Sequence, residues 1–155
     1  MSIPIVTLGM SGAVGSRVAS RLRPEFDTIQ FITSLPRAKS DLTTLLAGKS
    51  PPPDPDNVGS HNFSQKPQAV VFGRAYTDEA VEELRQHCGG SESGLAWVMS
   101  TKEARDKVMK GFPYGGDQEA FNRYADKTTA ITKGVLEDLR REGKLGRDGV
   151  YYYGE

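Results

Sequence analysis

The sequence predicts an α/β protein with a small Rossmann-like three-layer fold, built on a mostly parallel sheet of four to five strands. An apolar run, residues 3–8, precedes three glycines and a helical pattern at the start of the chain. Later apolar runs alternate with further helical patterns, which predicts parallel strands joined by right-handed crossovers. The 155 residues suit one domain with a sizeable core, so we expect a single domain over residues 1–155.

The first apolar run is rich in β-branched residues, which is typical of a buried parallel strand. Gly9, Gly12 and Gly15 follow it with the spacing G-x-x-G-x-x-G. The next apolar residues have helical spacing: Val14, Val18, Ala19 and Leu22. The predicted order is therefore strand, glycine turn and helix.

This order is the context that a dinucleotide-binding turn requires. Gly9 would allow a sharp turn, Gly12 would allow the backbone to approach a pyrophosphate, and Gly15 would allow close packing of helix and strand. The phosphate would lie on the helix N-terminus, where free N–H groups and the helix dipole favour an anion. The alternative interpretation is a tight strand–helix turn without a ligand, which leaves the α/β prediction unchanged.

A second strand is predicted over residues 26–33. NAD-preferring folds place an Asp or Glu at the end of this strand, where it binds the ribose 2′-hydroxyl. This chain has no carboxylate there before Asp41. It has hydroxyl groups and cations instead: Thr33, Ser34, Arg37 and Lys39. Such groups suit a 2′-phosphate, so we expect NADP to be preferred over NAD. The alternative is that Arg37 and Lys39 are solvated loop charges.

The middle of the chain predicts little regular structure. Residues 41–47 should form a short helix capped by Ser40 or Asp41. Residues 50–67 are rich in Pro, Asp, Asn and Ser, which indicates an irregular surface loop. A third Rossmann strand would fall near here, but residues 58–63 are a poor candidate, so we expect it to be short or absent.

The second half of the chain continues the alternation of strands and helices. We expect strands at residues 68–73, 94–100 and 150–153, the last of them at a sheet edge. We expect helices from Thr77 to about Cys88, over residues 102–110, and over residues 118–142. The last is a long amphipathic C-terminal helix with one largely apolar face: Phe121, Tyr124, Thr128, Ile131, Val135 and Leu139.

Composition excludes several classes of function. Lys+Arg and Asp+Glu both total 20, so no basic excess indicates binding to nucleic acid or to a membrane. No stretch is long enough to span a bilayer, and the N-terminus lacks a signal-peptide pattern. One cysteine, Cys88, and two histidines predict neither a disulfide nor a metal site. We expect a cytoplasmic protein.

The sequence GMSGAVG, followed by a strand that ends in TSLPRAK, resembles the atypical short-chain dehydrogenase/reductases. Within them it is most similar to the fungal NmrA-like NADP-binding proteins, which carry a glycine-rich turn and a basic patch after the second strand. The resemblance is carried by roughly the first third of the chain, and the middle strands match by pattern alone.

The resemblance assigns a cofactor role to three groups of residues. It implies that the pyrophosphate lies against Gly9, Met10, Ser11, Gly12, Ala13, Val14 and Gly15. It implies that the adenosine 2′-phosphate lies near Thr33, Ser34, Arg37 and Lys39. It implies that Gly73 and Arg74, just after the QAVVFG strand, flank the adenine or the ribose.

The chain departs from this family in its catalytic residues and in its length. It is shorter than typical members, has no separate substrate-binding region and lacks the Tyr-x-x-x-Lys pair, in which the lysine lowers the pKa of the tyrosine acid. Ser100 and Tyr114 stand where the Ser and Tyr of an active enzyme would, but Gln118 replaces the lysine. Tyr124 and Lys127 form an alternative pair with the wrong spacing. These four residues are the catalytic candidates: Ser100, Tyr114, Tyr124 and Lys127.

Three functions remain in competition. The first is a small NADP-dependent oxidoreductase with a diverged active site and an unknown small-molecule substrate. The second is a non-catalytic NADP-sensing regulator, and the third is a cofactor-free isomerase or cyclase that kept the fold. We also expect a homodimer, because a chain this short cannot easily close a pocket over a nicotinamide. Its interface would use the long C-terminal helix or the 150–153 edge, and the alternative is a monomer.

Overall fold

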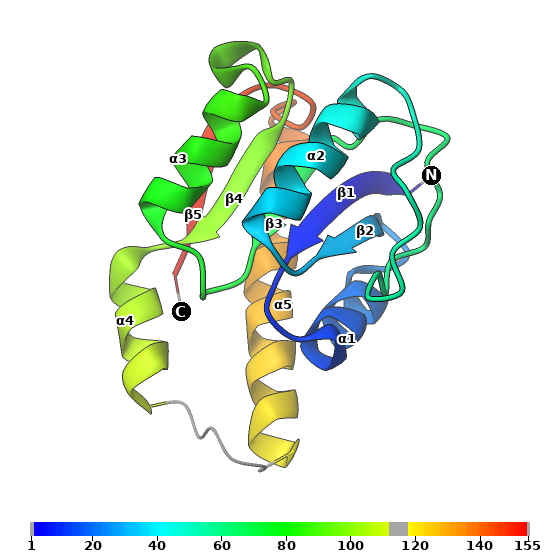
Figure 1. Cartoon of the computed structure of the whole chain (residues 1–155). Coiled ribbons are helices and arrows are strands. Elements are labelled where there is room, and N and C mark those ends of the chain that lie inside the picture. Colours follow the sequence, from blue (N-terminus) through cyan, green and yellow to red (C-terminus); the bar gives the residue numbers. More distant parts are fainter. Residues whose placement is uncertain (1, 112–117, 155) are drawn as a thin grey trace.

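The computed structural model describes residues 2–111 and 118–154, and it is an α/β fold with a five-stranded, all-parallel sheet (Figure 1). The strand order is β2-β1-β3-β4-β5. The strands are β1 (Ile3–Leu8), β2 (Phe26–Ile32), β3 (Ala69–Phe72), β4 (Ala96–Ser100) and β5 (Gly149–Tyr153). The helices are α1 (Gly12–Leu22), α2 (Leu35–Leu46), α3 (Asp78–His87), α4 (Lys102–Gly111) and α5 (Gln118–Arg141), with a short 3-10 turn, η1, at Gly90–Glu92. The predicted fold class is confirmed.

Two apolar layers hold helices on both faces of the sheet. On one face, Leu42 of α2 and Leu84 of α3 are buried against β1, β3 and β4. On the other face, Leu22 of α1 and Leu136 of α5 are buried against the same strands. Parallel sheets need this cover on both faces, because their strands are apolar on both sides. Helices α1 and α5 therefore lie side by side behind the sheet in Figure 1, and α2 and α3 lie in front of it.

The connection between β4 and β5 has the opposite hand to the other three crossovers. The steps from β2 to β3 and from β3 to β4 move toward β5 and cross the face that carries α2 and α3. The step from β4 to β5 moves in the same direction, but α5 lies on the opposite face, beside α1. The expectation of right-handed crossovers throughout is therefore wrong for this connection. Helix α5 is the element that covers this face next to α1.

The outer edge of β2 is covered by part of the irregular loop. The N–H groups of Ser60 and His61 donate to the carbonyls of Thr28 and Ile29 at 2.8 and 3.1 Å. The side chain of Asn57 accepts from the N–H of Phe31 at 2.7 Å. These contacts occupy the place of a third Rossmann strand, yet no strand forms among residues 50–67. The expectation that the third strand is short or absent is confirmed.

Helix α2 begins earlier than the sequence indicated. It starts at Leu35, with Ser34 as its N-cap, and the Ser34 hydroxyl accepts from the N–H of Arg37 at 3.3 Å. The expectation of a helix capped by Ser40 or Asp41 is therefore wrong. A capping serine followed by proline in the first turn is a helix-start signal, because proline lacks an N–H that would be unpaired there anyway.

The ring of Phe31 sets how closely α1 approaches the sheet. A Cβ atom placed on Gly15 would lie 2.6 and 2.7 Å from Cζ and Cδ1 of Phe31. A Cβ atom on Gly9 would lie 3.1 Å from Cε1 of the same ring. Both glycines are therefore needed by the packing of the protein itself, and Gly15 has the close-packing role expected for it.

Replacing Gly15 by Ala should destabilise the fold by about 1–3 kcal/mol, because the added methyl group overlaps the Phe31 ring. The matched control is Gly134→Ala in α5, where an added Cβ has no atom within 4 Å among the described residues. Helix propensity alone should make that control more stable, by about 0.5–1 kcal/mol. Urea unfolding of both variants gives the comparison, and a Gly15→Ala variant as stable as the wild type would contradict the packing account.

Replacing Asn57 by Ala should cost about 1–3 kcal/mol, because buried polar groups lose their partners. The Asn57 oxygen accepts from Phe31 and Gly59, and its amide nitrogen donates to Gln30 at 2.6 Å. Asn62→Ala removes only exposed local bonds and should change stability by less than about 0.5 kcal/mol. Thermal melts of the two variants compare them directly, and equal melting temperatures would mean that the loop does not anchor β2.

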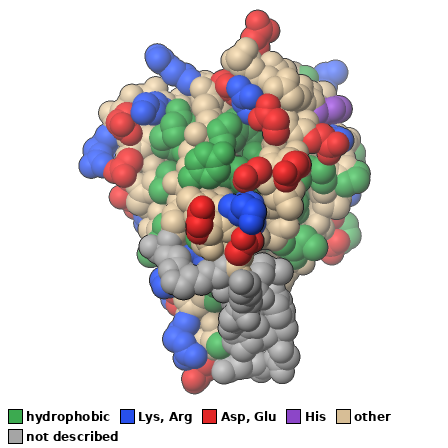
Figure 2. Space-filling view, turned by 90° about the vertical axis from the view of Figure 1, so that its left-hand side faces the viewer, with side chains coloured by type: hydrophobic (Ala, Val, Ile, Leu, Met, Phe, Trp, Pro, Cys, Tyr) green, Lys and Arg blue, Asp and Glu red, His purple; other side chains and the backbone are tan. Residues whose placement is uncertain are grey.

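The expected homodimer can be tested at β5, because among the described residues this strand pairs only with β4 and its other edge is open to a second copy of the chain. Figure 2 shows the side of the molecule that carries β5, where apolar side chains lie among charges of both signs. Tyr152 is 53% exposed. Light scattering after gel filtration should give twice the chain mass of 16.9 kDa. Tyr152→Lys should lower that mass toward the monomer, and Ala47→Lys, on α2's exposed end, should not. A monomer at all concentrations would contradict the prediction.

Candidate functional site

The carboxyl ends of β1 and β3 form the topological switch point of the sheet. These strands are neighbours, and their connections leave in opposite directions toward β2 and β4. Ligands of open α/β sheets bind in the crevice that such a reversal creates. The chain approaches itself closely here, because the Gly73 N–H donates to the Leu8 carbonyl at 2.8 Å. A Cβ on Gly73 would lie 3.3 Å from that oxygen, so glycine suits this position.

The glycine turn leads directly into the N-terminus of α1. Ser11 is the N-cap, and its hydroxyl accepts from the N–H of Val14 at 3.5 Å. The N–H groups of Gly12 and Ala13 have no partner among the described residues, since helix geometry gives them none and no side chain reaches them. The turn therefore leaves two unpaired donors at the positive end of an 11-residue helix, just after the carboxyl end of β1.

Gly12 differs from the other two glycines of the motif. A Cβ on Gly12 would meet only Cγ1 of Val58, at 3.9 Å, which is ordinary van der Waals contact. Its backbone does not adopt the positive φ that favours glycine. Neither packing nor backbone conformation therefore explains why residue 12 is glycine. Open space beside unpaired N–H groups is what a bound phosphate requires.

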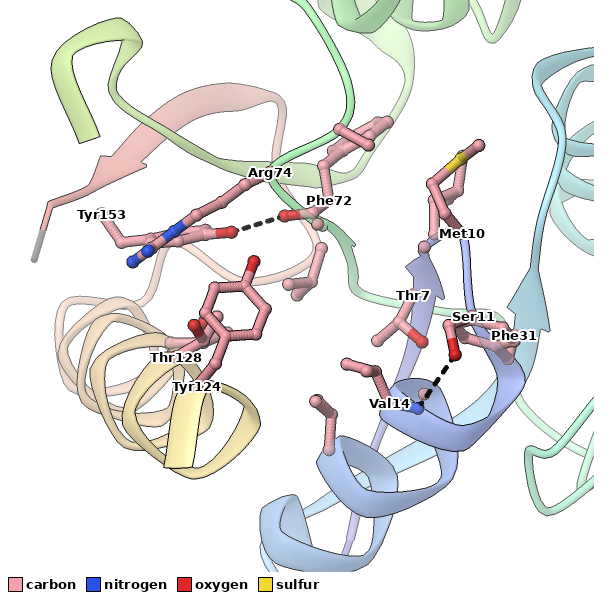
Figure 3. A pocket seen from close by; sticks show the side chains of 18 residues that line it. Thr7, Met10, Ser11, Val14, Phe31, Phe72, Arg74, Tyr124, Thr128 and Tyr153 are labelled. Carbon is pink, nitrogen blue, oxygen red and sulfur yellow. Dashed lines mark hydrogen bonds between the residues drawn. The ribbon is translucent and has the colours of Figure 1, made fainter. Parts of the chain in front are cut away.

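A cavity of about 330 Å³ opens beside this turn and extends between α1 and α5 (Figure 3). Its volume lies at the low end of the range for small-molecule sites. Residues expected to bind the cofactor line much of it: Gly9, Met10, Ser11, Val14, Gly15, Gly73 and Arg74. Gly12 and Ala13 belong to the same turn but do not line the cavity. At the end away from the turn, Arg74 lies with Tyr124 of α5 and Tyr153 of β5.

Arg74 is buried, with 5% of its surface exposed, and lies against two aromatic rings. Its guanidinium carbon is 5.6 Å from the ring centroids of both Tyr124 and Tyr153, which is cation–π distance. One Nη donates to the Gly154 carbonyl at 3.3 Å, but Nε has no hydrogen-bond partner. Among the described residues no carboxylate lies within 4 Å of this cation.

Tyr153 is held as a neutral phenol. Burial raises its pKa well above the usual range, and its O–H donates to the Phe72 carbonyl at 2.7 Å. The hydroxyl of Thr128, one turn after Tyr124 in α5, is buried and has no partner. Tyr124, Thr128 and Thr132 all line the cavity from one face of α5. The spacing i, i+4, i+8 of these hydroxyls was the available signal, but the sequence analysis placed Tyr124 and Thr128 on the largely apolar face of the helix and left Thr132 out.

The cations expected at a 2′-phosphate are engaged elsewhere. Arg37 Nε lies 3.2 Å from Asp41 and 3.7 Å from Asp54, and both carboxylates are largely buried. Lys39 pairs with Glu83 of α3 at 3.3 Å. Thr33 and Ser34 do stand at the carboxyl end of β2, but neither they nor the two cations line the cavity. The four residues are therefore near one another without forming one open site.

The catalytic candidates are not brought together. Tyr124 lines the cavity, whereas Lys127 is exposed and does not. Ser100 is buried at the end of β4, outside the cavity lining, and its hydroxyl has no partner. Tyr114 lies outside the described residues. Arg105 caps this end of the sheet, donating to the Ser100 carbonyl at 3.2 Å and pairing with Asp78 at 3.3 Å.

No family model, curated protein or solved structure gives a significant match to this chain. Within the described residues, no cluster of three His, Cys, Asp or Glu side chains could hold a metal ion, and no helix is long and apolar enough to cross a membrane. Cys88 is a free thiol whose pKa burial raises to about 11, so it is a poor nucleophile at neutral pH.

Proposed function

We propose that this chain binds a dinucleotide of the NADP type, with the pyrophosphate on the N-terminus of α1, and that it is a small oxidoreductase with a diverged active site. The observation that carries the proposal is Gly12. It is a glycine that no internal contact requires, beside two unpaired N–H groups, at the switch point of a parallel sheet. The resemblance of GMSGAVG to the NmrA-like turn supports the same assignment.

The residues at the turn fit a pyrophosphate. The N–H groups of Gly12 and Ala13 can donate to phosphate oxygens, and the helix dipole favours the negative charge. The cavity between α1 and α5 continues from this point and is large enough for one mononucleotide half of the ligand. The other half would extend over the carboxyl edge of the sheet toward Thr33 and Ser34.

NADP preference requires a rearrangement at the end of β2. Arg37 would exchange Asp54, at 3.7 Å, for the 2′-phosphate, and Lys39 would leave Glu83. The Lys39–Glu83 pair is partly exposed and contributes little stability, so breaking it costs little. The Asp54 carboxylate is only 8% exposed, so the release of Arg37 from it is the costlier step, which the bond to the 2′-phosphate would offset. The Arg37–Asp41 pair, with its buried carboxylate, would remain in place.

When bound, NADPH supplies a hydride. The chain must then position a carbonyl compound beside it and provide a proton to the carbonyl oxygen. Tyr124 is the phenol that lines the cavity, and we assign the proton-donor role to it. Since Lys127 is exposed outside the cavity, the lysine of the family pair has no counterpart at that residue.

A non-catalytic NADP-sensing regulator is the second candidate. The separation of Tyr124 from Lys127 favours it, because the usual proton-donating pair is not assembled. Oxidation of NADPH in the presence of a panel of carbonyl compounds separates the two functions. Turnover that is lost in Tyr124→Phe would support the oxidoreductase, and tight binding without any turnover would support the regulator.

Replacing Gly12 by Val should abolish NADPH binding while the fold is kept, because the side chain fills the space that the pyrophosphate needs. Isothermal titration measures the dissociation constant, and circular dichroism with a thermal melt checks the fold. Gly134→Val, on the exposed surface of α5, is the matched control and should bind like the wild type. An unchanged dissociation constant in Gly12→Val would favour the turn without a ligand, whereas a wild type that does not bind NADPH would favour the cofactor-free enzyme.

NADPH should bind more tightly than NADH, by about 1–3 kcal/mol from charge-assisted bonds to the 2′-phosphate. Replacing Arg37 and Lys39 by Ala should remove that difference and leave NADH binding unchanged. Lys49→Ala and Lys66→Ala, which remove exposed loop cations, serve as the control for net charge. Equal affinities of the wild-type protein for NADH and NADPH would contradict the expected preference.

A further inference from the structure

Among the described residues, Arg74 differs from the other arginines that are shielded from solvent, because each of those pairs with a carboxylate. Arg105, the other buried arginine, pairs with Asp78 at 3.3 Å. The half-buried Arg85 pairs with Asp148 at 2.6 Å, and Arg37 pairs with Asp41. Among the described residues, only Arg74 lies at the wall of the cavity with no carboxylate within 4 Å. A buried cation without a counterion is costly, so its retention calls for a partner that the described residues do not supply.

The contacts of Arg74 define how such a partner would bind. The guanidinium lies over the rings of Tyr124 and Tyr153, and one Nη is held by the Gly154 carbonyl. The Nε–H remains unpaired and buried. A guanidinium presents its N–H groups in a fixed planar fork, so two of them can bind two oxygens of a planar group side-on.

A second unpaired group lies in the same cavity. The buried hydroxyl of Thr128 has no hydrogen-bond partner among the described residues, and Thr128 lines the wall formed by α5, next to Tyr124 (Figure 3). A hydroxyl can donate to an anion and accept from a ligand O–H. The rest of the wall near it is apolar, with Val18 and Val71. The end of the cavity near Arg74 therefore offers one cation, one hydroxyl and an apolar surface for a short carbon chain.

We infer that Arg74 and Thr128 form a carboxylate-binding subsite, and that the substrate is a small organic acid. The guanidinium binds the carboxylate side-on, and Thr128 donates to it or to a neighbouring oxygen. The inference rests on the proposed function for the reaction, since the acid would be held between Arg74 and a dinucleotide at the glycine turn. The binding step itself depends only on the residues of this cavity.

The test measures binding of L-lactate and of its neutral amide, lactamide, by isothermal titration at constant ionic strength. The wild type should bind lactate at least about ten-fold more tightly than lactamide, because only the acid pairs with Arg74. Arg74→Gln should lose that difference, and Thr128→Val should weaken lactate binding while its thermal melt stays unchanged. Equal binding of acid and amide to the wild type, or lactate binding kept in Arg74→Gln, would overturn the subsite.

Two further measurements separate this inference from the proposed function. If Arg74 serves the acid and not the cofactor, NADPH affinity should stay within about two-fold of the wild type in Arg74→Gln; a larger loss would mean that Arg74 contacts the cofactor, as the family resemblance implies, and would overturn the subsite. Inorganic phosphate that binds more tightly than lactate would likewise overturn the carboxylate assignment. A wild type that binds lactate over lactamide but does not bind NADPH would contradict the proposed function and leave the subsite standing. Without ligand, Arg74→Gln should have a melting temperature no lower than that of the wild type. A purely structural role of Arg74 would instead lower the melting temperature of the variant.

Discussion

The packing of the Phe31 ring against Gly9 and Gly15 is the contact on which the site depends. It brings the first turn of α1 against β2 at a distance that any side chain at residue 15 would prevent. The N-terminus of α1 is thereby held at the carboxyl edge of the sheet, beside the end of β1. The unpaired N–H groups of Gly12 and Ala13 are positioned by this packing, and not by a ligand.

The cavity has a second requirement, which is the placement of α5. Because the β4–β5 crossover takes the unusual hand, α5 lies beside α1 and brings Tyr124 and Thr128 to the face that the glycine turn overlooks. The same crossover ends in β5, which carries Tyr153 to the other side of Arg74. If the crossover had run over the face of α2 and α3, Tyr124 and Thr128 would not line the cavity.

The fold was largely predictable from the sequence, because apolar runs and helix-start signals are local. The five strands and the long helix fall within a few residues of their expected positions. The start of α2 was missed because Ser34 was assigned to a cofactor phosphate and not to a helix cap. The hand of the last crossover could not be predicted, since it depends on which face of the sheet remained uncovered.

The site was predictable only where a motif is local. The glycine turn was recognised because its spacing follows directly from one strand. The ion pairs of Arg37 and Lys39 were missed, because Asp54 and Glu83 reach them from distant segments. The environment of Arg74 was missed for the same reason, as Tyr124 and Tyr153 are 50 or more residues away in the chain. The periodicity of a sequence does not show which distant charged residues the fold brings together.

The most direct test of the account is a nitrogen-15 NMR titration with NADPH. The amide resonances of Gly12 and Ala13 should shift most, because the pyrophosphate binds their unpaired N–H groups, whereas the Gly9 N–H already donates to the Ile32 carbonyl. The resonances of η1 (Gly90–Glu92), which follows the C-terminal end of α3 and lies outside the cavity lining, should move little and provide an internal reference. Saturating NADPH that leaves the turn amides unshifted, or shifts them no more than those reference amides, would contradict the account.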